Sequence, residues 1–266
     1  MDDALPPPVV PPDIYDDSYF RDTCGGSDAW RNSGGARADG IYYGSLHRAK
    51  LQPGEVVVDI GTGRGELLAV AIEMGASRAI GVEYAEAAVA MARQTIEVHG
   101  VTDKAEVILG DARSIPVDDE TVDLVTLLDV VEHLAPAELD RTLREARRLL
   151  RPGGRLFIHT FPTRTIYDYT YRFQRVLWPG RRKSWPAEPR KPKEITMHVN
   201  EQTLWSLRGA LRNAGFRESN VQLGEWVYTD MVPDEKARKL YHWLAKVPFT
   251  PVKALGVSNL FATATK

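Results

Sequence analysis

The sequence has one cysteine, no long apolar run and almost no net charge. Cys24 has no second cysteine to pair with, so the chain forms neither an internal disulfide bond nor a cysteine-ligated zinc site, which suits the reducing cytoplasm. No apolar stretch approaches the roughly 20 residues that a membrane-spanning helix needs. The formal net charge of −2 over 266 residues excludes strong electrostatic attraction between the whole molecule and nucleic acid. We therefore expect a cytoplasmic protein without a transmembrane segment.

The amino-terminal residues show neither of the two common targeting patterns. They begin with acidic residues and continue into a proline-rich stretch from Pro6 to Pro12, which is typical of neither a signal peptide nor a transit peptide. Because prolines at this density supply few backbone hydrogen-bond donors, we expect residues 1–13 to form a disordered tail. The remaining residues, 14–266, are enough to bury one full core, and we expect them to form a single domain.

Short β-rich runs alternate with longer helical stretches from about residue 50 onwards. The run at residues 56–60 is largely apolar and is bounded by glycine, as in a strand buried between two layers. The alternation predicts right-handed βαβ units and a doubly wound α/β fold, which is a mostly parallel sheet with helices on both faces. The predicted strands in this part are residues 56–60, 79–83, 106–109, 122–128 and 155–160, and the predicted helices are residues 66–74, 85–98 and 136–150.

The alternation ends beyond residue 161. A helix is expected over about residues 202–213, followed by β-like stretches over 221–227 and 258–265. A further helical segment is expected between these two stretches, at about residues 235–246.

A glycine-rich loop over residues 59–65 joins the first predicted strand to the first predicted helix. Glycines at positions such as Gly61 and Gly63 permit positive φ angles and let a ligand approach the main chain without a Cβ atom in the way. The helix start behind the loop offers free N–H groups. By itself the pattern fits either a ligand-binding turn or a tight connection.

An acidic residue stands near the end of each of the first three predicted strands. Asp59 is in the first, and Glu83 ends the second, where a carboxylate can accept hydrogen bonds from both hydroxyls of a ribose. Asp111 follows the third, where a carboxylate can bind an exocyclic amine. Since the carboxyl ends of parallel strands meet at one edge of a sheet, these acids predict one crevice for a nucleoside-bearing ligand.

Five segments that contain these residues resemble, in order, the motifs of the class I, Rossmann-like methyltransferases that depend on S-adenosylmethionine (SAM). They are Val58–Gly65, Val82–Glu83, Gly110–Ala112, Asp123–Leu134 and Leu150–Leu156. Five motifs in order are far more specific than any one of them. The resemblance covers about residues 40–161, and it implies SAM as the cofactor and a seven-strand, mostly parallel sheet whose last strand is antiparallel.

The resemblance also implies roles for the residues of the crevice. The loop glycines would bind the methionine part of SAM, with Asp59 near its amino group. Glu83 would bind the ribose, and Asp111 with the Ala112 N–H would bind the adenine edge. Asp129, after the fourth strand, would lie where the sulfonium points. The implied cofactor-binding residues are Asp59, Gly61, Gly63, Gly65, Glu83, Asp111, Ala112, Asp129 and Tyr84, which would line the adenine pocket.

A nicotinamide-dependent oxidoreductase on a similar sheet is the competing interpretation. Its glycine fingerprint requires a third glycine at position 66, where this chain has Glu66. A carboxylate at that place would repel a pyrophosphate, whereas SAM carries a sulfonium and no phosphate. The sequence therefore favours SAM.

Acidic and histidine side chains follow the fourth predicted strand, at the place where the methyl group of SAM would point. If the acceptor is a hydroxyl or a protonated amine, a general base with a near-neutral pKa helps, and His133 is the leading candidate. The alternative is that Glu132 and His133 only cap the strand or order the loop. The candidate catalytic residues are His133, Glu132 and the distant His198.

The same side chains, with Asp129, form an oxygen and nitrogen set that a divalent metal could use. The set is similar to the Glu-x-x-Glu-His motif with a distant histidine of metal-dependent RNA 2′-O-methyltransferases and of some quinone-biosynthesis O-methyltransferases, except that its first acid is an aspartate. Ligand spacing across distant segments does not show in a sequence, so metal binding stays open and no ligand is assigned. We expect His159, in the fifth strand, to be a buried core or crevice histidine.

Residues 162–199 form a basic and aromatic insertion. Between residues 162 and 193, nine lysines and arginines stand against two acids, a net charge of +7, and six aromatic residues fall in the same stretch. Ile166, Tyr169 and Phe173 follow helical spacing and predict a short amphipathic helix. The resemblance implies that this insertion is a lid that helps to cover the acceptor. We also expect residues 14–50, which contain several glycines, to form an N-terminal lid.

Three kinds of partner fit such an insertion. It can bind an anionic or aromatic small molecule through Arg164, Arg172 and Arg175, it can follow single-stranded RNA, or it can lie on an anionic membrane surface with Trp178 and Trp185 at the headgroups. A solvated basic loop is the plain alternative. We favour methyl transfer to the oxygen or nitrogen of a small-molecule or lipid-linked acceptor, because we find no added RNA-binding domain. An RNA methyltransferase and a SAM-binding protein without transferase activity are the alternatives.

Overall fold

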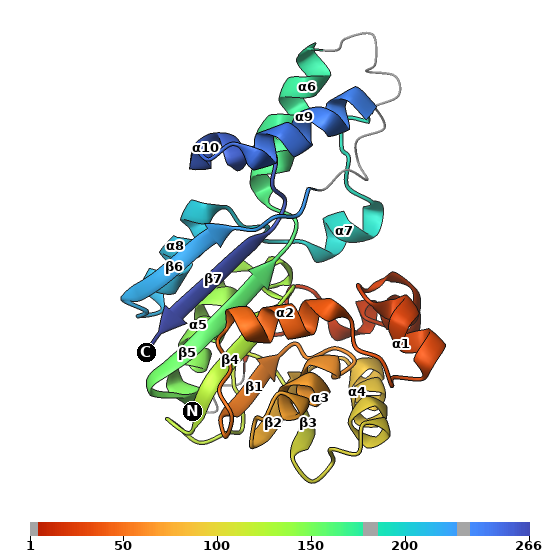
Figure 1. The fold of residues 1–266 in the computed structure, drawn as a ribbon, viewed down its shortest axis with the longest axis vertical. Coiled ribbons are helices and arrows are strands. Elements are labelled where there is room, and N and C mark those ends of the chain that lie inside the picture. The colour runs from red at the N-terminus through yellow and green to blue at the C-terminus, as the bar shows by residue number, and fades with distance from the viewer. Residues whose placement is uncertain (1–4, 178–185, 228–234) are drawn as a thin grey trace.

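One sheet forms the centre of the molecule. The computed structural model describes residues 5–177, 186–227 and 235–266, and in them seven strands are ordered β3-β2-β1-β4-β5-β7-β6 (Figure 1). β1 pairs in parallel with β2 and β4, and β7 is antiparallel to both β5 and β6. The prediction of a mostly parallel sheet with an antiparallel last strand is therefore confirmed. The strands are β1 Val56–Ile60, β2 Arg78–Glu83, β3 Ala105–Leu109, β4 Val122–Leu128, β5 Leu150–Thr160, β6 Glu218–Leu223 and β7 Leu260–Thr265.

The helices differ widely in length, and the longest ones flank the parallel part of the sheet. The α-helices of the described residues are α1 Ser27–Ser33, α2 Gly40–Arg48, α3 Glu66–Glu73, α4 Glu86–Val98, α5 Pro136–Leu149, α6 Arg172–Leu177, α7 Pro192–Met197, α8 Leu204–Asn213, α9 Glu235–Lys246 and α10 Thr250–Lys253. Short 3-10 or π turns are η1 Pro12–Ile14, η2 Tyr19–Thr23, η3 Val131–His133 and η4 Ile166–Tyr171.

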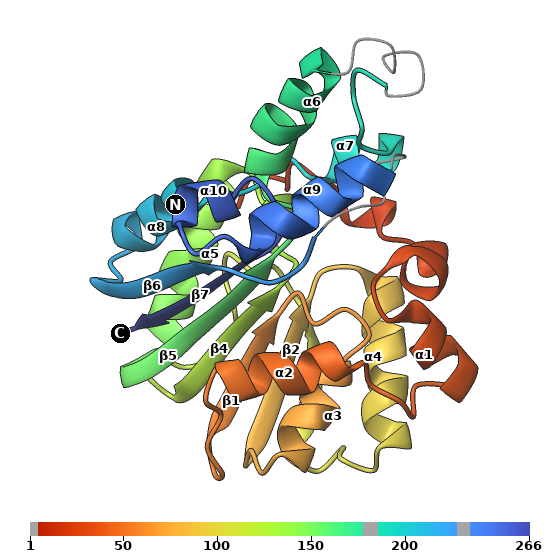
Figure 2. The same ribbon diagram turned by 45° about the horizontal axis from the view of Figure 1, so that its top comes forward.

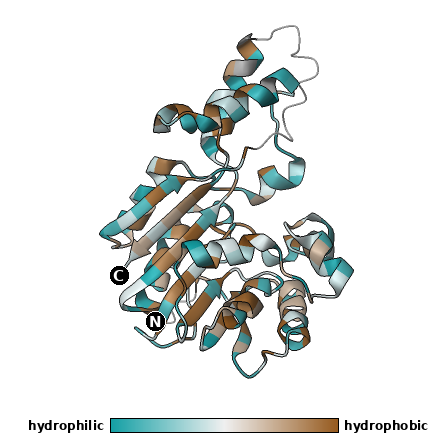
Figure 3. Ribbon diagram, in the orientation of Figure 1, coloured by the Kyte–Doolittle hydropathy of each residue, from teal (hydrophilic) through white to brown (hydrophobic). Residues whose placement is uncertain are grey.

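Apolar cores lie on both faces of the sheet. Val58 of β1 belongs to the same core as Leu143 of α5 and Leu207 of α8. Val57, the preceding residue, faces the other side and belongs to a core with Leu68 of α3 and with residues of α2 and α4. Figure 2 shows these two helical layers, and Figure 3 shows the hydrophobic colour concentrated in the central strands and α3. Burial on both faces explains why the strands are apolar runs rather than alternating ones.

The amino-terminal segment packs against this body. Val10 is 3% exposed and shares a core with Tyr15, Phe20 and Met91, and the Val9 N–H donates to Glu138 Oε1 over 2.9 Å. The prediction of a disordered tail is therefore wrong for residues 5–13. The prediction fails because a proline-rich chain, although poor in hydrogen-bond donors, can still bury an apolar side chain such as that of Val10.

Two separate segments meet beyond the carboxyl ends of the parallel strands. Figures 1 and 2 both place α6 and α9 side by side there, and we call η4, α6, α9 and α10 the cap. Tyr241 of α9 is fully buried in one cluster with Tyr167 and Tyr171 of η4. Antiparallel neighbours such as β6 and β7 can be joined by a two-residue turn. Here residues 224–259 connect them in the sequence, and this connection contains α9 and α10 of the cap. The sequence predicts the α9 helix but not its packing against the insertion.

The helical phase of η4 and α6 differs from the expected one. Ile166 is buried, as predicted, but Tyr169 and Phe173 are exposed, so these residues do not form one buried stripe. A π-helical turn over residues 166–171 takes more than 3.6 residues, and it therefore shifts the buried face to Ile166, Tyr167 and the residues that follow one turn later.

Two predictions concern residues outside the described ranges. They are the membrane contacts of Trp178 and Trp185, and the disorder of residues 1–4, the first part of the expected tail. Among the residues that are described, no helix is both long enough and apolar enough to span a bilayer.

Candidate active site

A cavity of about 640 Å³ opens at the carboxyl edge of the parallel strands. Its walls come from the loops after β1, β2, β3 and β4, from the amino-terminal segment and from α7. All of the predicted cofactor-binding residues except Gly65 line it, as do the three predicted catalytic residues. The topology thus brings the predicted site residues together at the point where the strand order reverses between β1 and β4, which is where ligands of open α/β sheets bind.

The glycines of the loop after β1 serve two different needs. Gly61 has a φ of 72°, and a Cβ atom there would lie 2.5 Å from Val130 Cγ2, so the loop can approach the end of β4 only with glycine. Gly65 has a φ of 76°, and a Cβ atom would lie 2.9 Å from the Cα of Ala92 in α4. Gly65 is therefore a packing residue between α3 and α4 and does not line the cavity, and its binding to the methionine part of SAM stays a prediction.

Glu83 is held in one orientation by main-chain donors. Its Oε1 accepts from the N–H groups of Tyr84 (2.9 Å) and Ala85 (3.0 Å), and its Oε2 accepts from the Gly63 N–H (3.0 Å). Burial raises the pKa of this carboxyl. A carboxylate with two oxygens has acceptor sites left for ligand hydroxyls, so its place in the cavity fits the expected ribose contact.

Asp59 lies deeper, under the loop. Its Oδ1 accepts a hydrogen bond from Thr126 Oγ1 over 2.6 Å. Burial raises the pKa of Asp59 to about 7, although the hydrogen bonds from Thr126 and Thr62 oppose the shift. Near neutral pH this carboxyl is therefore poised between its two protonation states, and a cationic amino group beside it would stabilise the charged one.

Asp111 and Ala112 form the far end of the cavity with Tyr84. Asp111 is bound by Arg113, whose Nη2 lies 2.6 Å from Oδ2 and whose Nε lies 2.9 Å from Oδ1. Although partial burial acts in the other direction, the hydrogen bonds from Arg113 keep the pKa of Asp111 below its usual value. The Tyr84 ring lies against Tyr15, with 5.7 Å between their centroids, so the amino-terminal segment covers this end.

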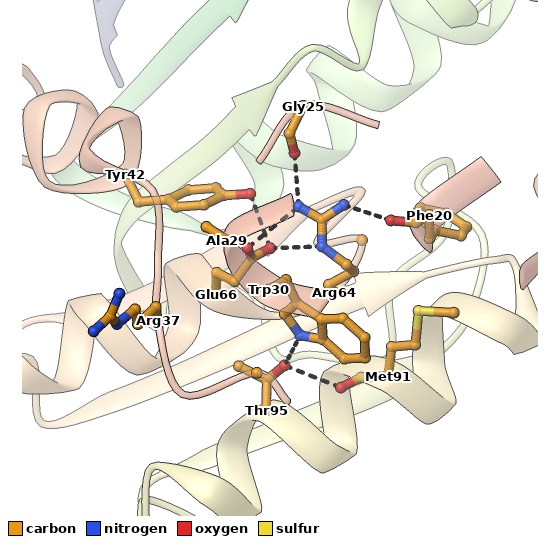
Figure 4. Close-up of polar contacts among 12 residues, drawn as sticks. Phe20, Gly25, Ala29, Trp30, Arg37, Tyr42, Arg64, Glu66, Met91 and Thr95 are labelled. Carbon is orange, nitrogen blue, oxygen red and sulfur yellow. Dashed lines mark hydrogen bonds and ion pairs between the residues drawn. The ribbon is translucent and has the colours of Figure 1, made fainter. Parts of the chain in front are cut away.

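A buried ion pair connects the glycine loop to the amino-terminal segment (Figure 4). Arg64 Nε lies 3.1 Å from Glu66 Oε2, and both side chains are almost completely buried. The same guanidinium donates to the carbonyl oxygens of Phe20 (2.8 Å) and Gly25 (2.6 Å). Tyr42 of α2 donates to Glu66 Oε2 over 3.0 Å. One arginine thus fixes residues 20–25 over the cavity.

This pair overturns the expectation that Glu66 would repel a pyrophosphate. The Glu66 carboxylate is compensated by Arg64 at 3.1 Å and accepts a further hydrogen bond from Tyr42, so it adds no net negative charge to the loop. Glu66 has a Cβ atom where a third glycine would have a second Cα hydrogen, but its charge does not select against phosphate.

His133 is enclosed rather than available as a base. Its Nδ1 lies 2.8 Å from the hydroxyl of Tyr15, and the ring also makes a hydrogen bond with the backbone of Met197. Burial, with a smaller contribution from the nearby His198 ring 4.8 Å away, lowers the pKa of His133 to about 3. The prediction of a near-neutral general base at His133 is therefore wrong, and the alternative role of ordering the surrounding loops fits the contacts.

Glu132 is also a structural contact. Its Oε2 accepts from Thr160 Oγ1 over 2.9 Å, and its carbonyl accepts from the Asn200 N–H over 3.0 Å. Burial and the nearby Asp129 raise the pKa of Glu132 well above its ordinary value. The residue therefore joins the ends of β4 and β5 to the segment after α7, through its side chain and its backbone carbonyl.

The four side chains that were considered as possible metal ligands contact different partners. Asp129 faces His159, Glu132 faces Thr160 and His133 faces Tyr15, while His198 Nδ1 lies 3.8 Å from Glu201 Oε1. Over the described ranges, no group of three or more histidine, cysteine, aspartate or glutamate residues is arranged to hold a metal ion.

Asp129 is positioned by a chain of buried side chains that sequence reasoning missed. Asn259 Oδ1 accepts from the Trp226 N–H over 2.9 Å, so the Asn259 amide nitrogen faces His159 Nε2 at 3.1 Å. If this amide nitrogen donates to Nε2, the other ring nitrogen, Nδ1, is the one that carries a proton, and it lies 2.8 Å from Asp129 Oδ1. His159 is fully buried, as predicted.

The backbone of Asp129 is unusual as well. It has a φ of 54°, in the left-handed region that non-glycine residues seldom adopt. Strained backbone of this kind concentrates at functional sites. The Asp129 side chain stays 44% exposed although the His159 ring 2.8 Å from its Oδ1 is fully buried. A carboxylate that is positioned by a buried ring on one side and is exposed on the other is suited to orient a ligand.

Aromatic residues of the cavity wall also escaped prediction. Tyr15, Tyr19 and Phe20 come from the amino-terminal segment, Phe161 follows β5, and Trp226 follows β6. A signal was present in the first group, since aromatic residues are closely spaced there in an otherwise polar stretch. Nothing local marks Trp226, which lines the cavity and whose backbone N–H donates to Asn259, 33 residues further along the chain.

A Rossmann-like sheet with acidic residues at three successive strand ends defines a class of nucleoside-binding α/β folds. Comparison with known proteins narrows the class. A family model described as a methyltransferase domain matches residues 58–158. The ubiquinone/menaquinone biosynthesis C-methyltransferase UbiE of Paraburkholderia phytofirmans is 30% identical over 202 residues, which are 69% of this chain and 81% of that protein.

Solved structures agree in fold. The methyltransferase in a complex with the Haloferax volcanii Trm112 methyltransferase activator has a TM-score of 0.59 at 19% identity and covers 94% of this chain and 96% of its own. The geranyl diphosphate C-methyltransferase of Streptomyces coelicolor, solved with S-adenosyl-L-homocysteine, has a TM-score of 0.58 at 14% identity, covering 85% and 77%. The chain belongs to the class I SAM-dependent methyltransferases, and SAM is its cofactor.

Proposed function

We propose that the protein transfers the methyl group of SAM to a small-molecule or lipid-linked acceptor that presents a flat apolar ring, at an oxygen or nitrogen atom on that ring. The observation that carries the proposal is the aromatic wall of the cavity over β4 and β5. Tyr19, Phe161 and Trp226 line this part, together with Met197 of α7. Aromatic and thioether side chains favour contact with flat apolar rings.

The two ligands divide the cavity according to the sheet. Asp59, Glu83 and Asp111 follow β1 to β3, and they suit the amino, ribose and adenine parts of SAM. When bound, SAM supplies a methyl group attached to a positively charged sulfur. The residues after β4 and β5, on the other side of the strand reversal, are left for the acceptor.

Asp129 supports an acceptor with a polar hydrogen. Transfer to a hydroxyl or an amine releases a proton, and His133 with a pKa of about 3 does not take it at neutral pH. Asp129 lines the cavity between the two halves, and His159 fixes one of its oxygens at 2.8 Å. We infer that Asp129 accepts a hydrogen bond from the acceptor and holds its nucleophilic atom in line with the methyl group, and that the proton released on transfer passes along this bond to the exposed carboxylate and from there to solvent.

Methylation at carbon is the second candidate, because the 30% identical relative is named a C-methyltransferase. A phenolic ring shares negative charge between its oxygen and its ring carbons, so the same cavity suits either outcome. RNA is less well supported. Arg164 lies 2.7 Å from Asp168, and Arg190 lies 2.7 Å from Glu188 and 3.1 Å from Glu201, so part of the positive charge of the insertion is already compensated.

The test is an incubation of the purified protein with methyl-labelled SAM and two sets of acceptors, a panel of phenols, anilines and hydroxyquinones and a panel of RNAs. We expect label in a ring-bearing small molecule, and nuclear magnetic resonance of the product assigns the oxygen, nitrogen or carbon atom. Trp226→Ala should raise the KM for that acceptor and leave the Kd for SAM unchanged. Label only in RNA would refute the proposal, and label on carbon would select the second candidate.

A further inference from the structure

The outward face of α9 carries positive charge and a tryptophan. Lys236, Lys239, Trp243 and Lys246 are spaced by three and four residues, which places them on one side of the helix. All four are exposed. The opposite side of the helix is anchored, since Tyr241 is fully buried against η4. The stripe is therefore presented to solvent by a firmly packed helix and not by a loose one.

Large apolar side chains are exposed on α9 and on other elements of the cap. Trp243 is 61% exposed, and Phe249, just beyond the end of α9, is 64% exposed. On the neighbouring helices of the cap, Tyr169, Phe173 and Val176 are all more than half exposed. Single exposed hydrophobic residues are ordinary, but a group of them on one part of a surface marks an interaction site.

The charge of this region is strongly one-sided. From residue 235 to residue 253 the sequence has five lysines and arginines and one acid, Glu235. Glu235 lies 2.8 Å from Lys239. Within the part of the chain that the structure describes, Lys236 and Lys246 form no ion pair. The stripe thus offers uncompensated positive charge to an anionic partner.

We propose that the outward face of α9, with Phe249, docks the protein on the surface of an anionic lipid bilayer. A tryptophan has an apolar body and a polar N–H, which suits the headgroup level, and lysines extend their charged ends to lipid phosphates. A helix that lies on the surface needs a basic face interrupted by an aromatic residue, which is what the stripe provides. A single-stranded nucleic acid binder instead follows the strand in a basic groove, and the stripe is convex.

The position of α9 connects docking to the cavity. α9 packs through Tyr241 on η4, and η4 follows the cavity residue Phe161 at the end of β5. The docked face would therefore place the acceptor side of the protein near the bilayer. The inference does not depend on the proposed acceptor, because docking is measured without SAM and without an acceptor.

The experiment is sedimentation of the full chain with sucrose-loaded vesicles of phosphatidylcholine alone and of phosphatidylcholine mixed with phosphatidylglycerol. We expect binding to the mixed vesicles only, and release at high salt. K236Q and K246Q should each weaken binding about fivefold, since each lysine near an anionic surface contributes about 1 kcal/mol. Trp243→Ala should weaken binding as well, and salt should release the protein from the vesicles before and after this substitution.

The matched control is Trp205→Ala, since Trp205 is 72% exposed on α8, outside the cap. This variant should bind like the unmodified protein. Equal binding to both kinds of vesicle, no binding to either, or equal losses for Trp205→Ala and Trp243→Ala would overturn the proposal. Retention by single-stranded RNA that K236Q and K246Q abolish, without vesicle binding, would assign the stripe to nucleic acid instead. Unchanged thermal unfolding shows that each variant is folded.

Discussion

The hydroxyl of Tyr15 lies 2.8 Å from Nδ1 of His133, and this contact joins the amino-terminal segment to the loop after β4. The same histidine contacts the backbone of Met197, at the end of α7. The amino-terminal segment and α7, which both line the cavity and are far apart in the sequence, therefore contact the same buried ring of His133. Five experiments test this and the other contacts of the site.

Replacing His133 should act on cofactor binding as well as on turnover. In His133→Ala the amino-terminal segment and α7 lose their common partner, so we expect a weaker Kd for SAM, a lower kcat and faster proteolysis before residue 27. Tyr15→Phe removes only the hydroxyl and should give a smaller change, about 1 kcal/mol in SAM binding. The measurements are calorimetry and limited proteolysis. A loss of kcat with unchanged SAM affinity and an altered pH profile would restore His133 as a base.

Arg64 should be important for stability because its removal leaves a buried carboxylate. Arg64→Met isolates Glu66, and breaking a buried ion pair in this way costs about 3–5 kcal/mol of unfolding free energy. The double variant Arg64→Met, Glu66→Met should recover much of the loss, because no charge is then left buried. Urea unfolding of the three proteins checks this. A double variant as unstable as the single one would show that the carbonyl contacts of Arg64, and not the charge pairing, dominate.

SAM binding should depend on pH through Asp59. Its pKa of about 7 in the free protein means that below pH 7 the carboxyl is mostly neutral. If the carboxylate binds the amino group of SAM, affinity should fall by up to about tenfold for each pH unit below 7. Calorimetry between pH 5.5 and pH 8.5 measures this. In Asp59→Asn the affinity should be low at every pH, and a variant with the wild-type pH dependence would rule Asp59 out.

The raised pKa of Asp59 should also make the folded protein more stable at low pH than at high pH, whereas SAM binding is favoured at high pH. The folded pKa of Asp59, about 7, lies above the unfolded value of about 3.9. Stability from the neutral carboxyl is therefore complete below about pH 4 and is lost as the pH rises to 7. Asp59→Asn should consequently raise the midpoint of thermal unfolding at pH 8 but hardly at pH 4.

Asn259 should influence the acceptor and not the cofactor. In Asn259→Leu the His159 ring loses the donor that fixes its tautomer, so Asp129 loses its fixed partner. We expect a kcat reduced by about tenfold or more and an unchanged Kd for SAM. Imidazole nitrogen chemical shifts of His159 should show the change of tautomer directly. Unchanged shifts together with unchanged kcat would mean that Asp129 is oriented by its backbone alone.

The parts of the fold that the sequence predicts are those with local causes. β1 to β5 are apolar runs bounded by glycine or proline, and α5 begins at Pro136 with Glu138 accepting from the Ala135 N–H, so their residue types alone determine them. The acids of the cofactor half are also predictable, because parallel strands carry their ends to one edge. Asp59, Glu83 and Asp111 therefore line the same cavity.

The rest depends on contacts between distant residues. The pKa of His133 follows from burial by Tyr15 and α7, which no local pattern reveals. The compensation of Glu66 requires that Arg64 turns back across the helix start. The placement of Asn259 beside His159 depends on how β7 pairs with β5. In each case the sequence shows which residues are present but not which of them neutralise or enclose each other.

The anchoring of the amino-terminal segment has a consequence for how this protein can vary. Arg64 donates to the main-chain carbonyls of Phe20 and Gly25, which every amino acid possesses. Substituting the residues that lie between Phe20 and Gly25 leaves both carbonyl acceptors in place, whereas inserting or deleting one residue there moves a carbonyl out of reach of Arg64. The attachment through Arg64 thus constrains the length of the covering segment more than its composition, so exposed side chains of the segment can change, and its specificity for ligands with them, without loss of this attachment.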